Sequence, residues 1–299
     1  MSGHSWGEGD EAPGVQRCHE RGLEAVRVVS ASGSLLVFRQ GAHVAEYQPG
    51  SGPGLLWLSS KSRFERGAAI RGGVPICFPW FGAHPSDPKL PAHGFARTSL
   101  FAYLGSQALT NERIALSFEL CADQTSRALW PADFRARLRV TLGDALELEF
   151  SVRNTGPREL DYEEALHTYF SVGDVRQIAI HGLLGAPYAD KVTGTSSVQD
   201  VERLTIASET DRVYESTKVC RLVDPGLSQQ VVVDKNGSAT TVVWNPLIEK
   251  ARRLSDFADD EYLGMVCIES ANTHGARIVL APGQEHSLFV RLCREPLEA

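Results

Sequence analysis

Residues 137–153 read RLRVTLGDALELEFSVR, a stretch in which apolar and polar residues alternate on both sides of Gly143-Asp144. The apolar residues that share a face are Leu138, Val140 and Leu142 before this pair and Leu146, Leu148, Phe150 and Val152 after it. A period of two is that of a half-buried β-strand. The stretch therefore predicts two antiparallel strands joined by a tight turn.

The same pattern recurs along the chain. Residues 113–120, RIALSFEL, alternate in this way. Residues 231–244, VVVDKNGSATTVVW, predict a second hairpin, because Asn236-Gly237 can take the positive φ values of a primed turn. Residues 277–293, RIVLAPGQEHSLFVRLC, predict two further strands separated by Pro282-Gly283.

Helical signals are few. Residues 245–257, NPLIEKARRLSDF, predict a helix that Asn245 caps and in which Pro246 takes the first position. The sequence has neither repeats nor the βαβ alternation of a parallel sheet. We therefore predict an all-β protein, a large antiparallel β-sandwich with a few short helices. We expect one domain over residues 22–299 and a flexible tail over residues 1–21.

Charge, cysteine content and the N-terminal sequence indicate which binding partners and which cellular compartment to expect. The chain has 30 Lys and Arg against 37 Asp and Glu, a net charge of −7, so it has no overall field that attracts nucleic acid or an anionic membrane. Its six cysteines form no CxxC pair, which favours reduced thiols. The first twenty residues lack the apolar core of an export signal, and no stretch is long enough for a membrane span. We expect a cytoplasmic monomer.

Several kinds of site are excluded by their missing motifs. The chain contains no P-loop, no G-x-S-x-G elbow and no HxH, HxxxH or HExxH pattern. His84 and His93 are close enough in sequence to share a metal ion, but they lack the spacing of a local zinc site. We expect neither a metal nor a cofactor.

One candidate pocket wall is the segment AIRGGVPICFPWFG at 69–82 together with LPAHGFARTSLF at 90–101. Glycine, proline and aromatic residues interrupt any regular strand there, while Arg71, His93 and Arg97 supply polar groups. Such a region is typical of a binding loop. Equally, it could be a buried loop whose two arginines bond backbone carbonyls.

Two further residues are candidates for proton transfer. His167 lies in LDYEEALHTYFSVGDV (160–175), which as a strand places Glu163, Ala165, His167 and Tyr169 on one face. Glu269 ends the apolar stretch before SAN, where partial desolvation would raise its pKa. Taken alone, His167 could be a core histidine with one hydrogen bond, and Glu269 could pair with Arg277.

Six strings of this chain, in order, resemble the glucose-6-phosphate 1-epimerase (hexose-6-phosphate mutarotase) family of the galactose-mutarotase-like superfamily. They span roughly residues 30 to 290 and are AIRGGVPICFPWFG, HGFAR, ALHTYF, YADK, VVWNPLIEKA and CIESAN. The resemblance implies a β-sandwich of the galactose mutarotase type. It also implies interconversion of the α and β anomers of a hexose 6-phosphate, without metal or cofactor.

The resemblance also implies roles for individual residues. His167 of ALHTYF matches the catalytic acid, and Glu269 of CIESAN matches the catalytic base. Further matches are to residues that bind the sugar phosphate: Arg71, His93 and Arg97 line the site, and Asp190 of YADK binds hydroxyl groups. Ala92 departs from the pattern, since some relatives carry a polar side chain there.

Three other functions compete with this one. An aldose 1-epimerase acting on free sugars would use the same acid and base, and Arg71 and Arg97 favour phosphate because a guanidinium group matches its geometry. A non-catalytic sugar-phosphate-binding protein would not need both His167 and Glu269. A glycosidase would need paired carboxylates, which the His and Glu combination fits poorly.

Overall fold

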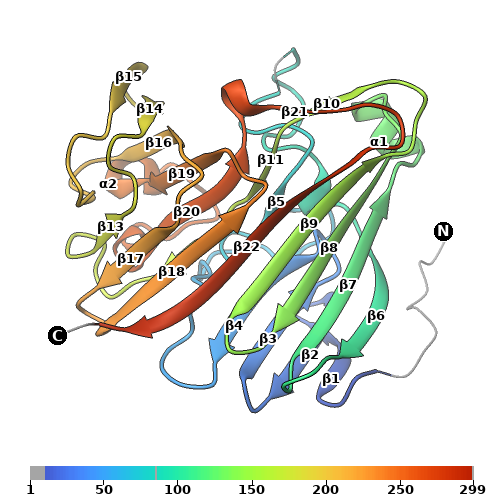
Figure 1. Ribbon diagram of the computed structural model, residues 1–299, viewed down its shortest axis with the longest axis horizontal. Coiled ribbons are helices and arrows are strands. Elements are labelled where there is room, and N and C mark those ends of the chain that lie inside the picture. Colours follow the sequence, from blue (N-terminus) through green and yellow to red (C-terminus); the bar gives the residue numbers. More distant parts are fainter. Residues whose placement is uncertain (1–10, 85, 298–299) are drawn as a thin grey trace.

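The computed structural model describes residues 11–84 and 86–297. These residues fold mainly into antiparallel strands, which form two eight-stranded sheets, one four-stranded sheet and one two-stranded sheet (Figure 1). The predicted all-β antiparallel architecture is confirmed.

The first large sheet, called here the β22 sheet, forms the near layer in Figure 1. In sheet order, its strands are β13 (Ala179–His181), β17 (Cys220–Asp224), β18 (Gln229–Asn236), β22 (Glu285–Pro296), β9 (Leu146–Asn154), β8 (Phe134–Leu142), β7 (Ile114–Cys121) and β6 (Ala102–Ala108). The hairpin predicted at 137–153 is confirmed, since β8 and β9 pair with Leu142 opposite Leu146. The seven apolar residues of its predicted inner face are all buried.

The second large sheet, called here the β20 sheet, carries most of the strings that suggested a family. In sheet order, its strands are β15 (Thr195–Val198), β14 (Pro187–Asp190), β16 (Thr210–Glu215), β19 (Thr240–Asn245), β20 (Met265–Asn272), β11 (Glu164–Leu166) and β5 (Ile76–Cys77), and β12 (Tyr169–Ser171) also pairs with β20.

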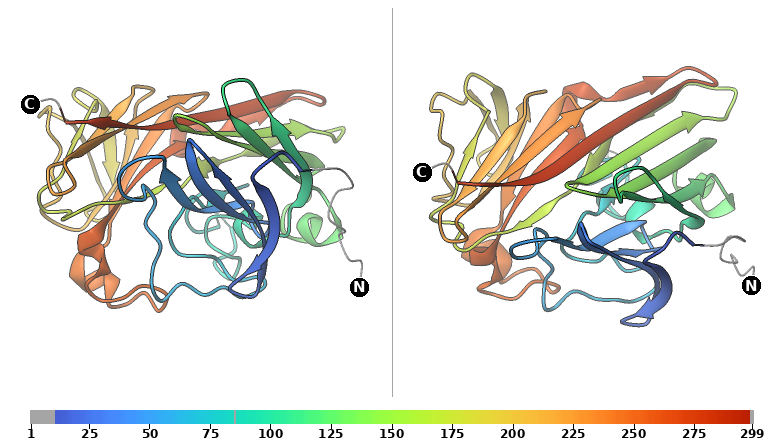
Figure 2. Two further views of the ribbon diagram at one scale, coloured as in Figure 1. Left: turned by 90° about the horizontal axis from the view of Figure 1, so that it is seen from below. Right: turned by 60° about the horizontal axis from the view of Figure 1, so that its bottom comes forward.

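Besides three short 3-10 helices, η1 (Ala96–Thr98), η2 (Glu261–Gly264) and η3 (His274–Ala276), the described part of the chain contains several smaller elements. They are β1 (Val15–Glu20), β2 (Leu23–Ser30), β3 (Gly33–Phe38) and β4 (His43–Pro49) in one sheet, β10 (Leu160–Tyr162) and β21 (Ile278–Leu280) in another, and the helices α1 (Gln124–Leu129) and α2 (Leu247–Ala251). In both views of Figure 2 the blue strands β1–β4 lie on one side of the sheet that contains β9 and β22. Across residues 11–84 and 86–297, no helix is both long and apolar enough to cross a membrane.

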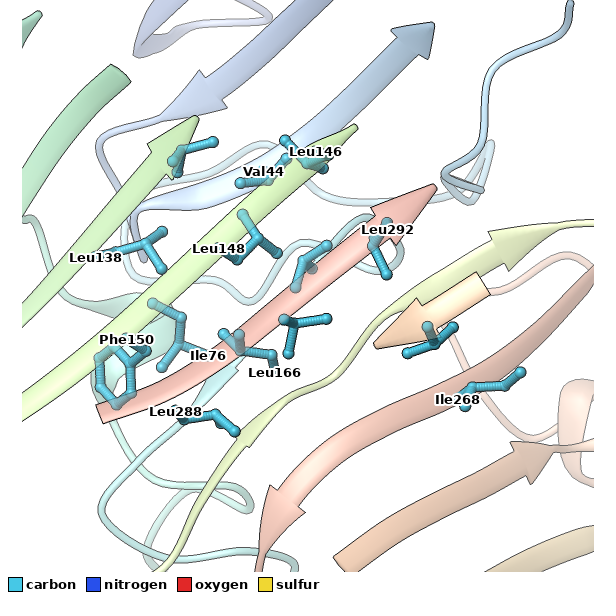
Figure 3. Packing of buried hydrophobic residues seen from close by; sticks show 14 of the residues in the cluster. Val44, Ile76, Leu138, Leu146, Leu148, Phe150, Leu166, Ile268, Leu288 and Leu292 are labelled. Carbon is cyan, nitrogen blue, oxygen red and sulfur yellow. The ribbon is translucent and has the colours of Figure 1, made fainter. Parts of the chain in front are cut away.

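The main core lies between the two large sheets. Figure 3 shows Leu166 of β11 and Ile268 of β20 pointing into the same cluster as Leu148 of β9 and Leu288 of β22. Burying each such side chain stabilises the fold by about 1.5–3 kcal/mol. Because side chains alternate along a strand, the neighbours of Ile268 point to the opposite face of the β20 sheet. That opposite face carries Cys267 and Glu269.

Three local predictions need correction. The expected tail over residues 1–21 is wrong for Val15–Glu20, which form β1 and pair with β2, while residues 1–10 lie outside the described residues. The predicted hairpin at 231–244 is also wrong. The strands β18 and β19 are present, and Gly237 between them has φ +67°. They do not pair with each other, because β18 pairs with β17 and β22, whereas β19 pairs with β16 and β20. The turn therefore passes the chain from one large sheet to the other.

The helix predicted over 245–257 is shorter than expected, since α2 spans only Leu247–Ala251. Asn245 is the last residue of β19, where its side-chain amide donates to the carbonyl oxygens of Tyr262 and Met265. Its side-chain oxygen accepts from the Leu247 N–H at 2.9 Å. The residue at the N-cap of α2 is Pro246, which makes no side-chain cap bond, so the expectation that Asn245 caps the helix and Pro246 takes its first position is wrong.

Candidate active site

His167 and Glu269 meet on the face of the β20 sheet that points away from the main core. The Nε2 atom of His167 lies 3.4 Å from Oε1 of Glu269. Glu269 belongs to β20, and His167 occupies the break between β11 and β12, which both pair with β20. The loop before β5 fixes this break, because the carbonyl of Pro75 accepts from the His167 N–H at 3.0 Å.

The His167–Glu269 pair is almost fully buried, with exposed fractions of 7% and 1%. Burial raises the pKa of Glu269 well above its ordinary value, and nearby Asp211 raises it further, against Lys191 and Arg97. Burial also lowers the pKa of His167 well below 6.5, as do His93, Arg71 and Arg97. A neutral imidazole beside a carboxylic acid holds as many protons as an imidazolium beside a carboxylate. The pair therefore holds a transferable proton without net charge.

Two polar atoms of the pair have no hydrogen-bond partner in the described part of the chain. They are Nδ1 of His167 and Oε2 of Glu269, both buried. A buried polar atom without a partner costs roughly 1–3 kcal/mol, and such atoms are rare in native proteins. Their coincidence on one acid–base pair indicates a place where a ligand supplies the missing partners.

His93 lies against the pair from the loop between β5 and β6. Its ring centroid is 5.7 Å from that of His167, and its Nδ1 accepts from the Gly82 N–H at 3.3 Å. Burial lowers the pKa of His93 well below 6.5, with contributions from Arg97, Lys191 and Arg71, so the ring is neutral. Since Nδ1 accepts, the remaining hydrogen is on Nε2, and His93 is a neutral hydrogen-bond donor.

The two predicted arginines have different partners. Arg71 donates to the Tyr169 hydroxyl at 3.0 Å and pairs with Asp256 at 3.1 Å. Arg97 donates to the carbonyl of Ala92 at 2.7 Å and makes no ion pair with any residue that the structure describes. Both influence the pKa of His167, so both lie near the pair. Arg97 thus has a backbone partner, as one alternative expected, but no carboxylate among the described residues pairs with its charge.

The structure does not bring Asp190 to the His167–Glu269 pair. Asp190 lies opposite Arg212 in the pairing of β14 with β16, and its carboxylate accepts from Arg212 Nε at 3.0 Å and from the N–H groups of Val192 and Thr193. Arg212 lies opposite Val243 of β19, which in turn lies opposite Ile268 of β20. Asp190 and Ile268 are therefore three strand spacings apart, or about 14 Å. Residues in register share a face, so Asp190 lies on the core side of the sheet.

Asp211, which the sequence did not single out, is the aspartate on the site face. It lies opposite Trp244 of β19, which is opposite Cys267 of β20, two residues from Glu269. Its two carboxylate oxygens lie 3.9 Å from Lys191 and 3.6 Å from Lys250. The alternation in TDRVYE separates Asp211 from Arg212, but only the strand pairing shows which face holds the site.

Aromatic rings surround the imidazole of His167. The ring of Tyr169 lies parallel to it, with a centroid distance of 4.7 Å and an interplanar angle of 8°. Trp244 meets it edge-on at 6.2 Å. Over residues 11–84 and 86–297, no group of three or more His, Cys, Asp or Glu side chains is placed to hold a metal ion. A buried acid and base, with cations and aromatic faces around them, can transfer protons to and from a polar ligand.

An antiparallel β-sandwich with a buried His–Glu pair of this kind defines a class of acid–base enzyme, and comparisons with known proteins identify the family. The model of the aldose 1-epimerase family matches residues 26–293. The chain belongs to this family, and it is an epimerase.

Individual relatives agree with this assignment. The chain is 35% identical over 234 residues to a protein of Escherichia coli strain K12 named "Putative glucose-6-phosphate 1-epimerase", covering 78% of this chain and 77% of the relative. A protein of the same name from Cenchrus ciliaris is 34% identical over 259 residues, or 83% and 78% of the two chains. A crystal structure of a "putative mutarotase" from Salmonella typhimurium matches with a TM-score of 0.89 and 30% identity, covering 96% and 95%.

Proposed function

We propose that this protein interconverts the α and β anomers of a hexose 6-phosphate, with His167 and Glu269 as its acid and base. The observation that carries the proposal is the buried His167–Glu269 pair at 3.4 Å, with one partnerless atom on each residue. The substrate class is supported by the relatives, which carry the name glucose-6-phosphate 1-epimerase.

The reaction requires opening and reclosing of a hemiacetal. Glu269 removes the proton of the C1 hydroxyl while His167 protonates the ring oxygen, and the bond between C1 and the ring oxygen breaks. The aldehyde rotates about C1–C2, and the ring closes with both proton transfers reversed. Because the two residues exchange acid and base roles, a pair in which burial disfavours either charge serves both directions.

The remaining polar groups are proposed to recognise the sugar phosphate. Arg97 is the favoured phosphate ligand, since its guanidinium group has no carboxylate partner within the described residues, whereas Arg71 is held by Asp256. Asp211 and the neutral Nε2–H of His93 are suited to hydroxyl groups.

The test is to compare kcat/KM for glucose 6-phosphate and free glucose by polarimetry or NMR exchange. Loss of one charge-assisted bond to phosphate costs about 1.5–3 kcal/mol, so Arg97→Ala should lower kcat/KM for the phosphate ester roughly 10- to 150-fold. The same variant should change kcat/KM for glucose far less, and Arg71→Ala provides the comparison. If wild type uses both sugars equally and neither variant changes the ratio, the protein acts on free sugars and the proposal fails.

Sugar phosphates are intracellular metabolites, and a cytoplasmic location is proposed on that ground. The free thiols of all six cysteines are consistent with a reducing compartment. A monomer is proposed because His167, Glu269, His93, Arg97 and Asp211 all come from one chain. Size-exclusion chromatography with light scattering tests the second point.

A further inference from the structure

The imidazole of His167 is one end of an aromatic stack that continues through Tyr169 to Trp57. Tyr169 is parallel to His167 within 8°, and its ring is inclined by 22° to that of Trp57 at a centroid distance of 5.7 Å. Phe257 packs against Trp57 at 4.9 Å. The Tyr169 ring is therefore held between two planar groups, one of which is the proposed catalytic acid.

Backbone and side-chain bonds fix this stack. The Trp57 N–H donates to the carbonyl of Tyr169 at 3.0 Å, and the Tyr169 N–H donates to the carbonyl of Gly73 at 2.9 Å. The phenol oxygen accepts from Arg71, which is itself paired with Asp256. Tyr169 is thus anchored at both ends of its side chain, and its ring orientation is set independently of His167.

The charged and titratable groups around His167 come from several elements. Glu269 approaches from β20, Arg71 from the loop before β5, and His93 and Arg97 from the loop between β5 and β6. A Glu269 carboxylate at 3.4 Å favours the imidazolium form, while His93 and the two arginines oppose it. Burial opposes it as well. The acid form of His167 therefore needs a further source of stabilisation.

The face of an aromatic ring carries partial negative charge, and a cation placed over it is attracted most strongly when both are removed from water. We propose that Tyr169 is a positioning residue whose ring face holds the His167 imidazole in plane and stabilises its protonated form for proton donation to the sugar. The inference rests on the proposed function, because it assigns Tyr169 a role in that reaction.

The experiment varies the electron density of the ring while keeping its shape. Tyr169→Phe is compared with mono-, di- and pentafluorinated phenylalanines placed at position 169, so that loss of the hydroxyl bond to Arg71 is common to the series. Fluorine withdraws negative charge from the ring face. We expect kcat for glucose 6-phosphate to fall stepwise with fluorine number, to about 10-fold below Tyr169→Phe, with KM nearly constant.

The pH profile gives the readout that a purely structural role would not change. Proton donation requires the imidazolium form, and a weaker ring face lets His167 lose its proton at lower pH. In a plot of kcat against pH, the fall of kcat at alkaline pH (the alkaline limb) should therefore move to lower pH by about one unit across the series. A kcat and an alkaline limb that do not change with fluorine number would overturn the inference.

Two controls distinguish a wrong role for Tyr169 from a variant that does not fold and from a wrong proposed function. Thermal melting identifies any variant that does not fold, and the monofluorinated ring is close enough in size to hydrogen-bearing phenylalanine to retain the fold. An inactive wild type would refute the proposed function itself. An active wild type with a flat fluorine series would refute only the role of Tyr169.

Discussion

At the scale of single residues, the central feature is a histidine and a glutamate that are buried together without compensating partners. His167 and Glu269 have 7% and 1% of their surface exposed, and each retains one polar atom without a hydrogen bond to the described residues. Such a pair is costly to the fold, because replacement by apolar residues would relieve its desolvation.

The first prediction concerns this pair. His167→Asn and Glu269→Gln should each lower kcat by roughly 100-fold or more, because each removes a group that transfers a proton. Both substitutions nearly preserve shape, so KM should change little. The rate of anomer exchange measured by NMR, with circular dichroism as a folding control, checks the result. Turnover close to that of wild type in either variant would refute the assignment.

The second prediction distinguishes the two aspartates. Asp211 lies on the site face, whereas Asp190 bonds Arg212 and a turn on the core side. Asp211→Asn should therefore lower kcat/KM by roughly 10-fold or more, since hydrogen bonds between charged groups and ligands contribute about 1.5–3 kcal/mol. Asp190→Asn is the matched control and should leave kcat/KM unchanged while lowering Tm. The reverse pattern would restore Asp190 as the sugar ligand.

At the scale of elements, the loop carrying His93 depends on a close approach of two backbone segments. Gly94 has φ +73°, and its N-terminal neighbour His93 has φ +63°. A Cβ at Gly94 would lie 2.0 Å from the carbonyl oxygen of Phe78, which accepts from the N–H groups of Phe95 and Ala96. The glycine of HGFAR is therefore required by space as well as by backbone conformation.

Gly94→Ala should accordingly destabilise the protein by more than about 2 kcal/mol, combining left-handed strain with a backbone clash. Gly185→Ala is the control, because Gly185 has φ +78° but a Cβ added there would meet nothing within 4 Å. That variant should lose only about 1–2 kcal/mol. Urea denaturation measures both, and equal losses would show that packing at Phe78 is not limiting.

Prediction of elements from the sequence succeeded where both partners of a pairing were adjacent in the chain. The β8–β9 hairpin follows from alternation around Gly143-Asp144. The Asn236-Gly237 sequence predicts a hairpin turn equally well, but the strands on either side join different sheets. Local turn chemistry does not determine long-range strand pairing. For the same reason the strings could not show that Asp211, rather than Asp190, shares a face of the β20 sheet with Glu269.

At the scale of the whole molecule, a buried carboxylate links the two large sheets. Glu164 of β11 is fully buried and lies 3.1 Å from Nε2 of His286 on β22, and it also accepts from Asn272 at 2.8 Å. The hydrogen bond with Glu164 raises the pKa of His286, against the effect of burial. Burial raises the pKa of Glu164, although His286 opposes this. The folded protein therefore binds a proton on Glu164 and a proton on His286 more tightly than the unfolded chain does.

A group with a raised pKa in the folded state contributes stability that is complete below its unfolded pKa and is lost as pH rises through its folded pKa. For His286 that loss begins above pH 6.5, its ordinary pKa. The free energy of unfolding should therefore decline as the pH rises above 6.5 toward the raised pKa of His286 in the folded protein. His286→Gln should remove this part of the slope in urea denaturation at several pH values. An identical slope in the variant would exclude the Glu164–His286 link as its cause.

The alternating faces of β20 also limit how this chain can change in length. Inserting one residue between Val266 and Cys267 would turn every later side chain of the strand over, directing Glu269 into the core and Ile268 into the site. Substitutions change one position at a time, but a single insertion there exchanges two whole rows of side chains. Insertions and deletions should therefore be accepted at turns such as 143–145, whereas β20 should tolerate only changes that preserve its residue count.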